Sequence, residues 1–157
     1  MSSSASARVS LGVDLLGVVA RLNRLATQRT TLPLPWAQAR LLGTIEDQGP
    51  TRISDLAALD HCSQPTMTMQ VRRLEDAGLV SRTTDPADAR AVLIEITAAG
   101  IETLRQVRAD RAGVIDPHIA SLDDDDRQTL AAAVSVLQRL LDDAAPKPVC
   151  SHRRTDK

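Results

Sequence analysis

The chain has 157 residues, enough for one domain with a substantial hydrophobic core. Hydrophobic residues make up 43% of it, but Trp36 is the single aromatic residue. The core must therefore be aliphatic, and modules that stack single-stranded nucleic acid on aromatic rings are disfavoured. The formal net charge is −1, so overall charge provides no attraction to DNA, and any DNA affinity must come from where the charges lie.

Targeting features predict a cytoplasmic protein with no membrane partner. No apolar run approaches the roughly 20 residues of a membrane helix. The Met-Ser-Ser-Ser-Ala-Ser-Ala start lacks the basic and then apolar layout of a signal peptide. Two distant cysteines do not make a disulfide framework.

The first part of the chain predicts two helices. Residues 1–7 are small and polar, and we expect them to be disordered. Apolar periodicity over Val9–Gln28 predicts the first helix, and the prolines at 33 and 35 separate it from the second, Trp36–Asp47. The inward positions of the second helix are Ala39, Leu42 and Ile45.

A helix-turn-helix pattern follows. Thr51–Ile53 is compatible with a short strand, and Ser54 is placed to cap a helix over Asp55–Leu59. A tight joint at 60–62 leads to Ser63, which is placed to cap a longer helix. Pro65 is tolerated in its first turn. Its apolar stripe consists of Met67, Val71 and Leu74.

The other face of this helix has the composition of a DNA-reading surface. It is short and polar at its start and basic at its end, so it fits a major groove, where its first turns read base edges and its last turn holds phosphates. The alternative is an ordinary amphipathic surface helix. The candidate DNA-binding residues are Ser63, Gln64, Pro65, Thr66, Thr68, Met69, Gln70, Arg72 and Arg73.

A basic-tipped hairpin is predicted next. Gly78 suits a left-handed helix end, and two short strands, Leu79–Thr83 and Ala91–Ile96, flank a polar turn. Candidate wing residues are Arg82, Asp88 and Arg90. Arg90 at the tip fits a narrow minor groove, oriented by an ion pair with Asp88, and the alternative is a solvent-facing turn charge. Helix, turn, helix and hairpin together predict a winged helix-turn-helix over residues 36–97.

The local charge balance argues against DNA binding. The segment 52–90 contains five arginines and six acidic residues. The acidic residues are Asp55, Asp60, Glu75, Asp76, Asp85 and Asp88.

Two further helical segments complete the prediction. Thr97 caps a helix from Ala98 to about Ile115, which Asp116-Pro117 interrupts, and Asp123–Asp126 open a last helix. Four adjacent aspartates point in different directions and cannot converge on one metal ion, whereas negative charge at a helix start is favourable. We therefore predict no metal site.

The outer helices, about 8–29 and 98–143, carry apolar stripes that the 45-residue segment Ile53–Thr97 cannot cover, so we expect a homodimer. Each buried side chain contributes about 1.5–3 kcal/mol. The alternative is packing within one subunit. The candidate interface residues are Leu11, Leu15, Val18, Leu22, Leu130, Val134, Leu137 and Leu141.

Several motifs carry a family resemblance over roughly Leu11 to Asp143. Ser54–Ala57, Leu74–Val80, the turn Asp85–Arg90 and the exit Ile96–Gly100 resemble the multiple-antibiotic-resistance-repressor (MarR) family. The resemblance implies a dimer that binds a pseudo-palindromic operator and often responds to a small aromatic or phenolic ligand or an oxidant. In this family the position of Ala89 is often basic, which implies reduced wing affinity here.

The sequence thus predicts a mainly α fold with a small β-hairpin wing, as one domain over residues 8–143 with a flexible tail at 144–157. We expect it to act as a ligand-responsive repressor that binds double-stranded DNA, and we expect neither a cofactor nor catalytic residues. The alternatives are a winged helix used for protein contacts and a redox- or ligand-sensing dimer. Minor expectations are an effector pocket with Trp36 and Arg40 and a packed Cys62, with oxidant sensing as its less favoured role. For Arg153 and Arg154 in the tail, a phosphate contact is the less favoured alternative to a purely flexible segment.

Overall fold

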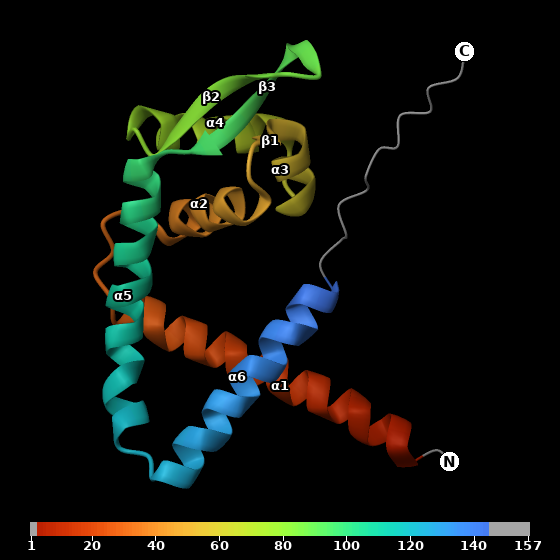
Figure 1. Cartoon of the computed structure of the whole chain (residues 1–157), viewed down its shortest axis with the longest axis vertical. Helices are drawn as coiled ribbons and strands as arrows, with labels where there is room; N and C mark the ends of the chain where they lie inside the picture. Colours follow the sequence, from red (N-terminus) through yellow and green to blue (C-terminus); the bar gives the residue numbers. More distant parts are fainter. Residues whose placement is uncertain (1–2, 145–157) are drawn as a thin grey trace. The chain divides into compact units, whose positions relative to one another are not determined.

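The computed structural model describes residues 3–144, with side chains described for 11–88 and 90–144. Within these residues it has the predicted class, mainly helical with a small antiparallel sheet (Figure 1). The chain forms two compact units, one up to Asp116 and one from Pro117 on. The elements are α1 (Ser3–Gln28), α2 (Trp36–Gln48), β1 (Thr51–Arg52), α3 (Ile53–Leu59), α4 (Gln64–Asp76), β2 (Val80–Asp85), β3 (Asp88–Ile96), α5 (Ala98–Ala120) and α6 (Asp124–Ala144).

The three strands form one antiparallel sheet in the order β1-β3-β2. Strand β1 confirms the short strand predicted before the helix-turn-helix, and its Thr51 pairs with Ile94. In the hairpin, Thr84 pairs with Val92, but the next residue, Asp85, pairs with Asp88. Residues 89–91 therefore bulge out of the ladder, at the point where Arg90 lies. Bulges of this kind redirect side chains at the edge of a sheet.

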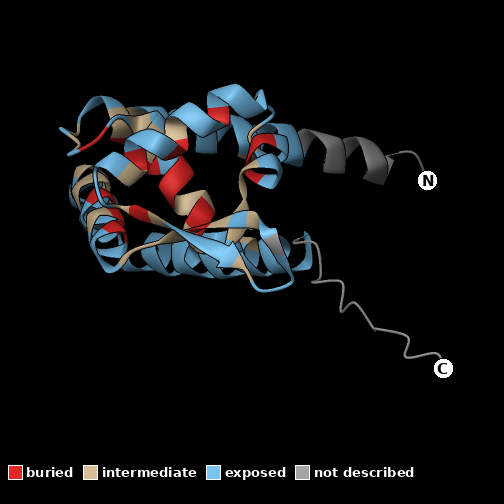
Figure 2. Ribbon diagram, turned by 90° about the horizontal axis from the view of Figure 1, so that it is seen from above, coloured by how far each residue is buried: buried red, intermediate tan, exposed pale blue. Residues whose placement is uncertain are grey.

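The core of the first unit lies between α2, α3, α4, the sheet and α5, and is aliphatic as predicted. The inward residues predicted for α2 and α4 are buried, among them Ile45 and Val71, each 0% exposed. Figure 2 shows the buried positions in red on the inward sides of these elements. The largest fully buried side chains are Leu42, Ile45, Leu56, Met67, Val71, Leu74, Ile94 and Val107.

The start of α5 is fixed directly to the joint between α4 and β2. Gly78, at φ +72°, ends α4 in the left-handed conformation that the sequence predicted. The Thr97 hydroxyl donates to the Gly78 carbonyl at 2.7 Å and accepts from the Gly100 N–H at 3.0 Å, which confirms the predicted cap. A Cβ built on Gly100 would lie 2.1 Å from the Leu79 carbonyl oxygen, so the two backbones touch here.

Three predicted helix boundaries were wrong. Helix α1 begins at Ser3, ahead of the predicted Val9, because residues 3–8 include two alanines and neither glycine nor proline. Helix α3 begins at Ile53, so Ser54 lies inside it and caps nothing. Helix α5 continues through Pro117 to Ala120, since the donor that proline lacks is lost only in the last turn.

In the second unit, Asp123 precedes α6 and its carboxylate accepts from the Asp126 N–H at 2.8 Å. The acidic run therefore caps and opens the helix, as its position predicted. None of the residues of α6 is buried. The tail predicted for 144–157, with Arg153 and Arg154, lies outside the described residues except for Ala144. In the described part of the chain, no helix is both long enough and apolar enough to cross a bilayer.

Candidate nucleic-acid interface

A compact joint positions the candidate reading helix α4 behind α3. The N–H groups of Asp60 and Cys62 donate to carbonyls of α3, both at 3.0 Å, and His61 between them adopts φ +50°. The Ser63 hydroxyl then accepts from the Thr66 N–H at 3.3 Å, which confirms the predicted cap of α4. The joint directs the start of α4 toward solvent, where a ligand can reach it.

The predicted outward face of α4 is open to solvent except at one position. Pro65 is exposed, and Met69 is 57% exposed. Gln70 is half-buried, so it lies at the margin of this face. The other predicted residues, Ser63, Gln64, Thr66, Thr68, Arg72 and Arg73, are all exposed.

The hairpin tip places Arg90 in solvent, but its predicted ion pair with Asp88 is absent. The Asp88 carboxylate instead accepts from the backbone N–H of Arg90 at 3.0 Å. Its second oxygen lies 3.9 Å from the Arg52 guanidinium. Asp88 therefore fixes the backbone of the bulge and leaves the Arg90 guanidinium unpaired, because a side chain two residues away can also bond the main chain.

Arg82 differs from the prediction because a neighbouring carboxylate holds it. Its Nε donates to both oxygens of Glu75, at 3.0 and 2.9 Å. Glu75 belongs to α4 and Arg82 to β2, so this ion pair joins the reading helix to the wing. Arg82 thus acts first as a link between the two elements.

A second link, which sequence reasoning missed, fixes the wing to β1. The Arg52 guanidinium donates to one Asp85 oxygen at 2.6 and 3.2 Å, and the other Asp85 oxygen accepts from the Ala87 N–H at 2.8 Å. The predicted short strand was the signal for this link, because pairing of β1 with the hairpin brings Arg52 close to the turn. Asp85 fixes both the turn and its attachment.

Replacing Asp85 with Asn is expected to loosen the wing. The Arg52 hydrogen bond, followed by the Ala87 N–H, lowers the pKa of the Asp85 carboxyl from its ordinary 3.8. A carboxyl whose pKa is lower in the folded state contributes stability above the unfolded pKa and loses it as the pH falls through the folded value. The protection factors of the wild-type wing amides, corrected for the intrinsic pH dependence of exchange, should therefore be high at neutral pH and fall below pH 3.8.

Amide hydrogen exchange of β2 and β3 checks this prediction. Asp85→Asn should exchange a few-fold faster than wild type already at neutral pH, because its carboxamide carries no charge for Arg52. The matched control is Asp76→Asn, which neutralises an exposed carboxylate at the end of α4. Equal wing exchange in Asp85→Asn and wild type would contradict the prediction.

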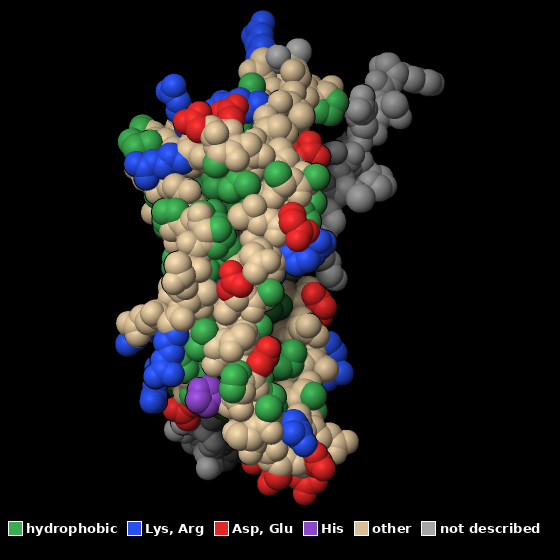
Figure 3. Space-filling model, turned by 90° about the vertical axis from the view of Figure 1, so that its left-hand side faces the viewer, with side chains coloured by type: hydrophobic (Ala, Val, Ile, Leu, Met, Phe, Trp, Pro, Cys, Tyr) green, Lys and Arg blue, Asp and Glu red, His purple; other side chains and the backbone are tan. Residues whose placement is uncertain are grey.

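The described side chains leave three arginines of this region without an acidic partner. Arg72, Arg73 and Arg90 form no ion pair with any described residue. Arg73 donates to the Met69 sulfur at 3.8 Å, which leaves its charge uncompensated. On the face in Figure 3, red and blue side chains are interspersed. Unpaired positive charge thus gathers on the outward side of α4 and at the hairpin tip.

Comparison with known proteins agrees with this geometry. Residues 34–92, which include the helix-turn-helix and most of the wing, match the family model described as MarR family. The helix-turn-helix and most of the wing of this chain are thus similar to those of the MarR family. An uncharacterized HTH-type transcriptional regulator of Mycobacterium bovis is 29% identical over 135 residues, covering 85% of this chain and 94% of that protein.

Solved structures support the same assignment. A putative transcriptional regulator of Pseudomonas aeruginosa superposes with a TM-score of 0.71 at 26% identity, over 90% of this chain and 97% of that one. A transcriptional regulator of Thermotoga maritima gives a TM-score of 0.68 at 25% identity, over 86% and 96% of the two chains. The MarR fold therefore extends over nearly all of this chain.

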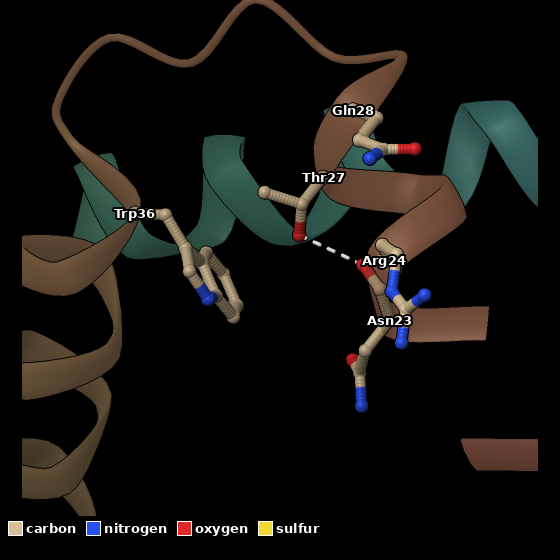
Figure 4. Close-up of a pocket in the computed structure, with 5 residues that line it drawn as sticks. All are labelled: Asn23, Arg24, Thr27, Gln28 and Trp36. Carbon is tan, nitrogen blue, oxygen red and sulfur yellow. Dashed lines mark hydrogen bonds between the residues drawn. The ribbon is translucent and has the colours of Figure 1, made fainter. Parts of the chain in front are cut away.

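A pocket of about 250 Å³ lies between the end of α1 and the start of α2. Figure 4 shows the Trp36 ring facing the side chains of α1 across it. The lining residues are Asn23, Arg24, Thr27, Gln28 and Trp36. Arg40, predicted to share a pocket with Trp36, is absent from this lining and pairs with Asp60 of the joint.

Arg111 of α5, which the sequence did not single out, lies against this pocket. Its guanidinium stacks 4.0 Å from the Trp36 ring centroid and donates to the Asn23 side chain at 2.8 Å. Its Nε is buried and has no hydrogen-bond partner. Burial lowers the pKa of Arg111.

The predicted interface residues are exposed or half-buried. On α1, Leu11 is 70% and Val18 53% exposed, and on α6, Leu130 is 40% and Leu141 66% exposed. Of the other predicted positions, Val134 and Leu22 are exposed, and Leu15 and Leu137 are half-buried. Each stripe is therefore largely uncovered by the other elements of its own unit.

The remaining candidates have structural roles. Cys62 is half-buried and packs against the hydrophobic core beside the joint. Among the described side chains, no group of three or more His, Cys, Asp or Glu is arranged to hold a metal ion.

Proposed function

We propose that this chain is a sequence-specific DNA-binding transcriptional regulator that represses as a homodimer in the cytoplasm. The observation that supports DNA binding most directly is the arrangement of unpaired arginines, with Arg72 and Arg73 on α4 and Arg90 at the wing tip. A basic helix end and a basic hairpin on one rigid scaffold suit a major groove and the adjoining minor groove. The match of residues 34–92 to the MarR family model supports the same function.

Selection of bound sequences from a random duplex pool tests this proposal. The selected sequences should contain inverted half-sites about one helical turn apart, because a two-fold dimer presents two equivalent helices. Affinity for them should fall steeply with salt, since each phosphate contact contributes about −0.9 to the logarithmic slope. Failure to bind any duplex at low ionic strength would overturn the proposal and favour a winged helix used for protein contacts.

The uncovered stripes of α1 and α6 support the homodimer. Sedimentation should show a dimer at micromolar concentration, and the double variant Val134→Asp/Leu141→Asp should be monomeric, because it places two carboxylates in an apolar contact. Leu59→Asp is the matched control, since Leu59 is 48% exposed on α3, outside both stripes. A wild-type monomer at this concentration would contradict the prediction.

We further propose that the Trp36 pocket binds a small aromatic or phenolic anion as effector. The supporting observation is Arg111, whose buried Nε lacks a partner beside the pocket and whose charge is partly desolvated. The two α4 helices of the dimer would have one spacing that fits the operator and another that does not. An anion that binds the second arrangement more tightly than the first would release the operator.

Because Trp36 is the single aromatic residue, its fluorescence reports on this pocket directly. A panel of aromatic acids and phenols should quench it, and Arg111→Gln should weaken acid binding about tenfold while leaving neutral phenols unchanged. Arg105→Gln, a change of an exposed arginine on the same helix, is the control. Equal loss for acids and phenols would contradict a charge-recognition role for Arg111.

A further inference from the structure

We propose that Met69 makes this protein prefer thymine at one position of each operator half-site, by contacting the thymine 5-methyl group; this inference rests on the proposed DNA-binding function. Met69 and Pro65 lie four residues apart, on the side of α4 opposite the buried Met67, Val71 and Leu74. Met69 is 57% exposed, and Pro65 is exposed too. Pro65 and Met69 therefore form an apolar ridge, without a hydrogen-bond donor in their side chains, in the middle of the outward face of α4.

The hydroxyl groups beside this ridge are largely used within the helix. The Thr68 hydroxyl donates to the Gln64 carbonyl at 2.8 Å. The Ser63 and Thr66 hydroxyls bond each other at 2.8 Å, and the Ser63 oxygen also accepts from the Thr66 N–H. Since each hydroxyl has one hydrogen, two of the three hydroxyl hydrogens are already used. The two threonines thus add methyl surface beside Pro65 and Met69.

The sulfur of Met69 has a defined neighbour on its helix. The Arg73 guanidinium donates to it at 3.8 Å, one turn further along. This contact restrains the flexible thioether and places the charge of Arg73 at the end of the ridge. A phosphate held by Arg73 would therefore fix how α4 sits along the groove, and the position of the Met69 side chain would follow.

The chemistry of the major groove matches an apolar ridge to one base. Thymine is the base that presents a methyl group there, whereas guanine, cytosine and adenine present only hydrogen-bonding groups at their edges. If the ridge lay against guanine, cytosine or adenine, the polar groups at the edge of that base would be buried without hydrogen-bond partners. Such unpaired polar groups reduce affinity. The ridge therefore favours thymine, and Gln64, at the start of α4, remains free for polar readout.

Replacement of thymine by deoxyuridine, which removes only the methyl group, tests the proposal. Duplexes selected from a random pool should contain thymine at a fixed place in each half-site. Substituting deoxyuridine there should weaken wild-type binding about fourfold per contacted methyl, the effect expected for burying one such group. The ratio of the affinity for the thymine duplex to that for the deoxyuridine duplex should fall to about one in Met69→Ala. Met69→Leu should keep the wild-type ratio.

Two controls separate this proposal from the proposed function. Leu59→Ala changes an exposed apolar residue outside the reading face and should keep the wild-type ratio. Thermal unfolding of all variants should match wild type. Salt-dependent duplex binding with no effect of deoxyuridine at any half-site position, or an unchanged ratio in Met69→Ala, would overturn the thymine assignment alone. Absence of all duplex binding would overturn the proposed function itself.

Discussion

Arg90→Ala is expected to weaken binding to every duplex about tenfold at low ionic strength, and to reduce the slope of log K against log salt by about one. The guanidinium lies at the tip of the hairpin with no acidic partner among the described side chains, so its full charge is available to DNA. The bulge at 89–91 and the Asp88 bond to its backbone hold the residue in place. Base preference should not change, because the contact depends on negative potential and not on base edges.

Anisotropy titrations of a selected operator and a scrambled duplex across a salt series measure this effect. Arg105→Ala is the control, because it removes the same charge from an exposed site on α5. By contrast, Gln64→Ala should alter the ratio between operator and scrambled duplex. If Arg90→Ala binds as tightly as wild type throughout the series, Arg90 makes no DNA contact and the wing assignment fails.

Internal ion pairing explains how a nearly neutral chain can present a basic surface. Glu75 and Asp85 each hold an arginine of the same region, Arg82 and Arg52, at 2.9 and 2.6 Å. These pairs connect α4 to β2 and β1 to the hairpin, so they orient the wing relative to the reading helix. Two of the acidic residues that argued against DNA binding in the sequence thus contribute to the scaffold, and the outward arginines have no acidic partner among the described side chains.

Local signals in the sequence predicted most of the fold. The cap at Ser63, the left-handed Gly78 and the stripe of Met67, Val71 and Leu74 each depend on neighbours within one or two helical turns. Such features can be read from spacing because helix geometry fixes which residues share a face. The hairpin was predicted for a related reason, since its strands are adjacent in sequence.

The missed features depend on partners distant in sequence. Arg52 meets Asp85 only because β1 pairs with β3, and Arg111 meets Trp36 only after α5 packs beside α2. The periodicity of a sequence carries no information about such pairings. The sequence therefore predicted Arg40 as the arginine beside Trp36, whereas the structure has Arg111 there. For the same reason the sequence could not show that the Asp88 carboxylate bonds the backbone.

Gly100→Ala is expected to destabilise the protein by about 3 kcal/mol, or roughly 10 °C in Tm for a chain of this size. The added Cβ would lie 2.1 Å from the Leu79 carbonyl oxygen and 2.7 Å from the Ile96 side chain. The carbonyl cannot move away freely, because it accepts the Thr97 N–H at 3.0 Å. Relief of the clash would therefore shift the first turn of α5 and break the Thr97 cap.

Thermal unfolding at one fixed protein concentration measures this effect, since the Tm of a dimer depends on concentration. Gly113→Ala is the matched control on the same helix, because no atom lies within 4 Å of its added Cβ. That variant should gain about 0.5–1 kcal/mol from better helix propensity, opposite in sign to Gly100→Ala. Similar Tm values for the two variants would show that the contact between Gly100 and Leu79 does not fix α5 to the winged helix.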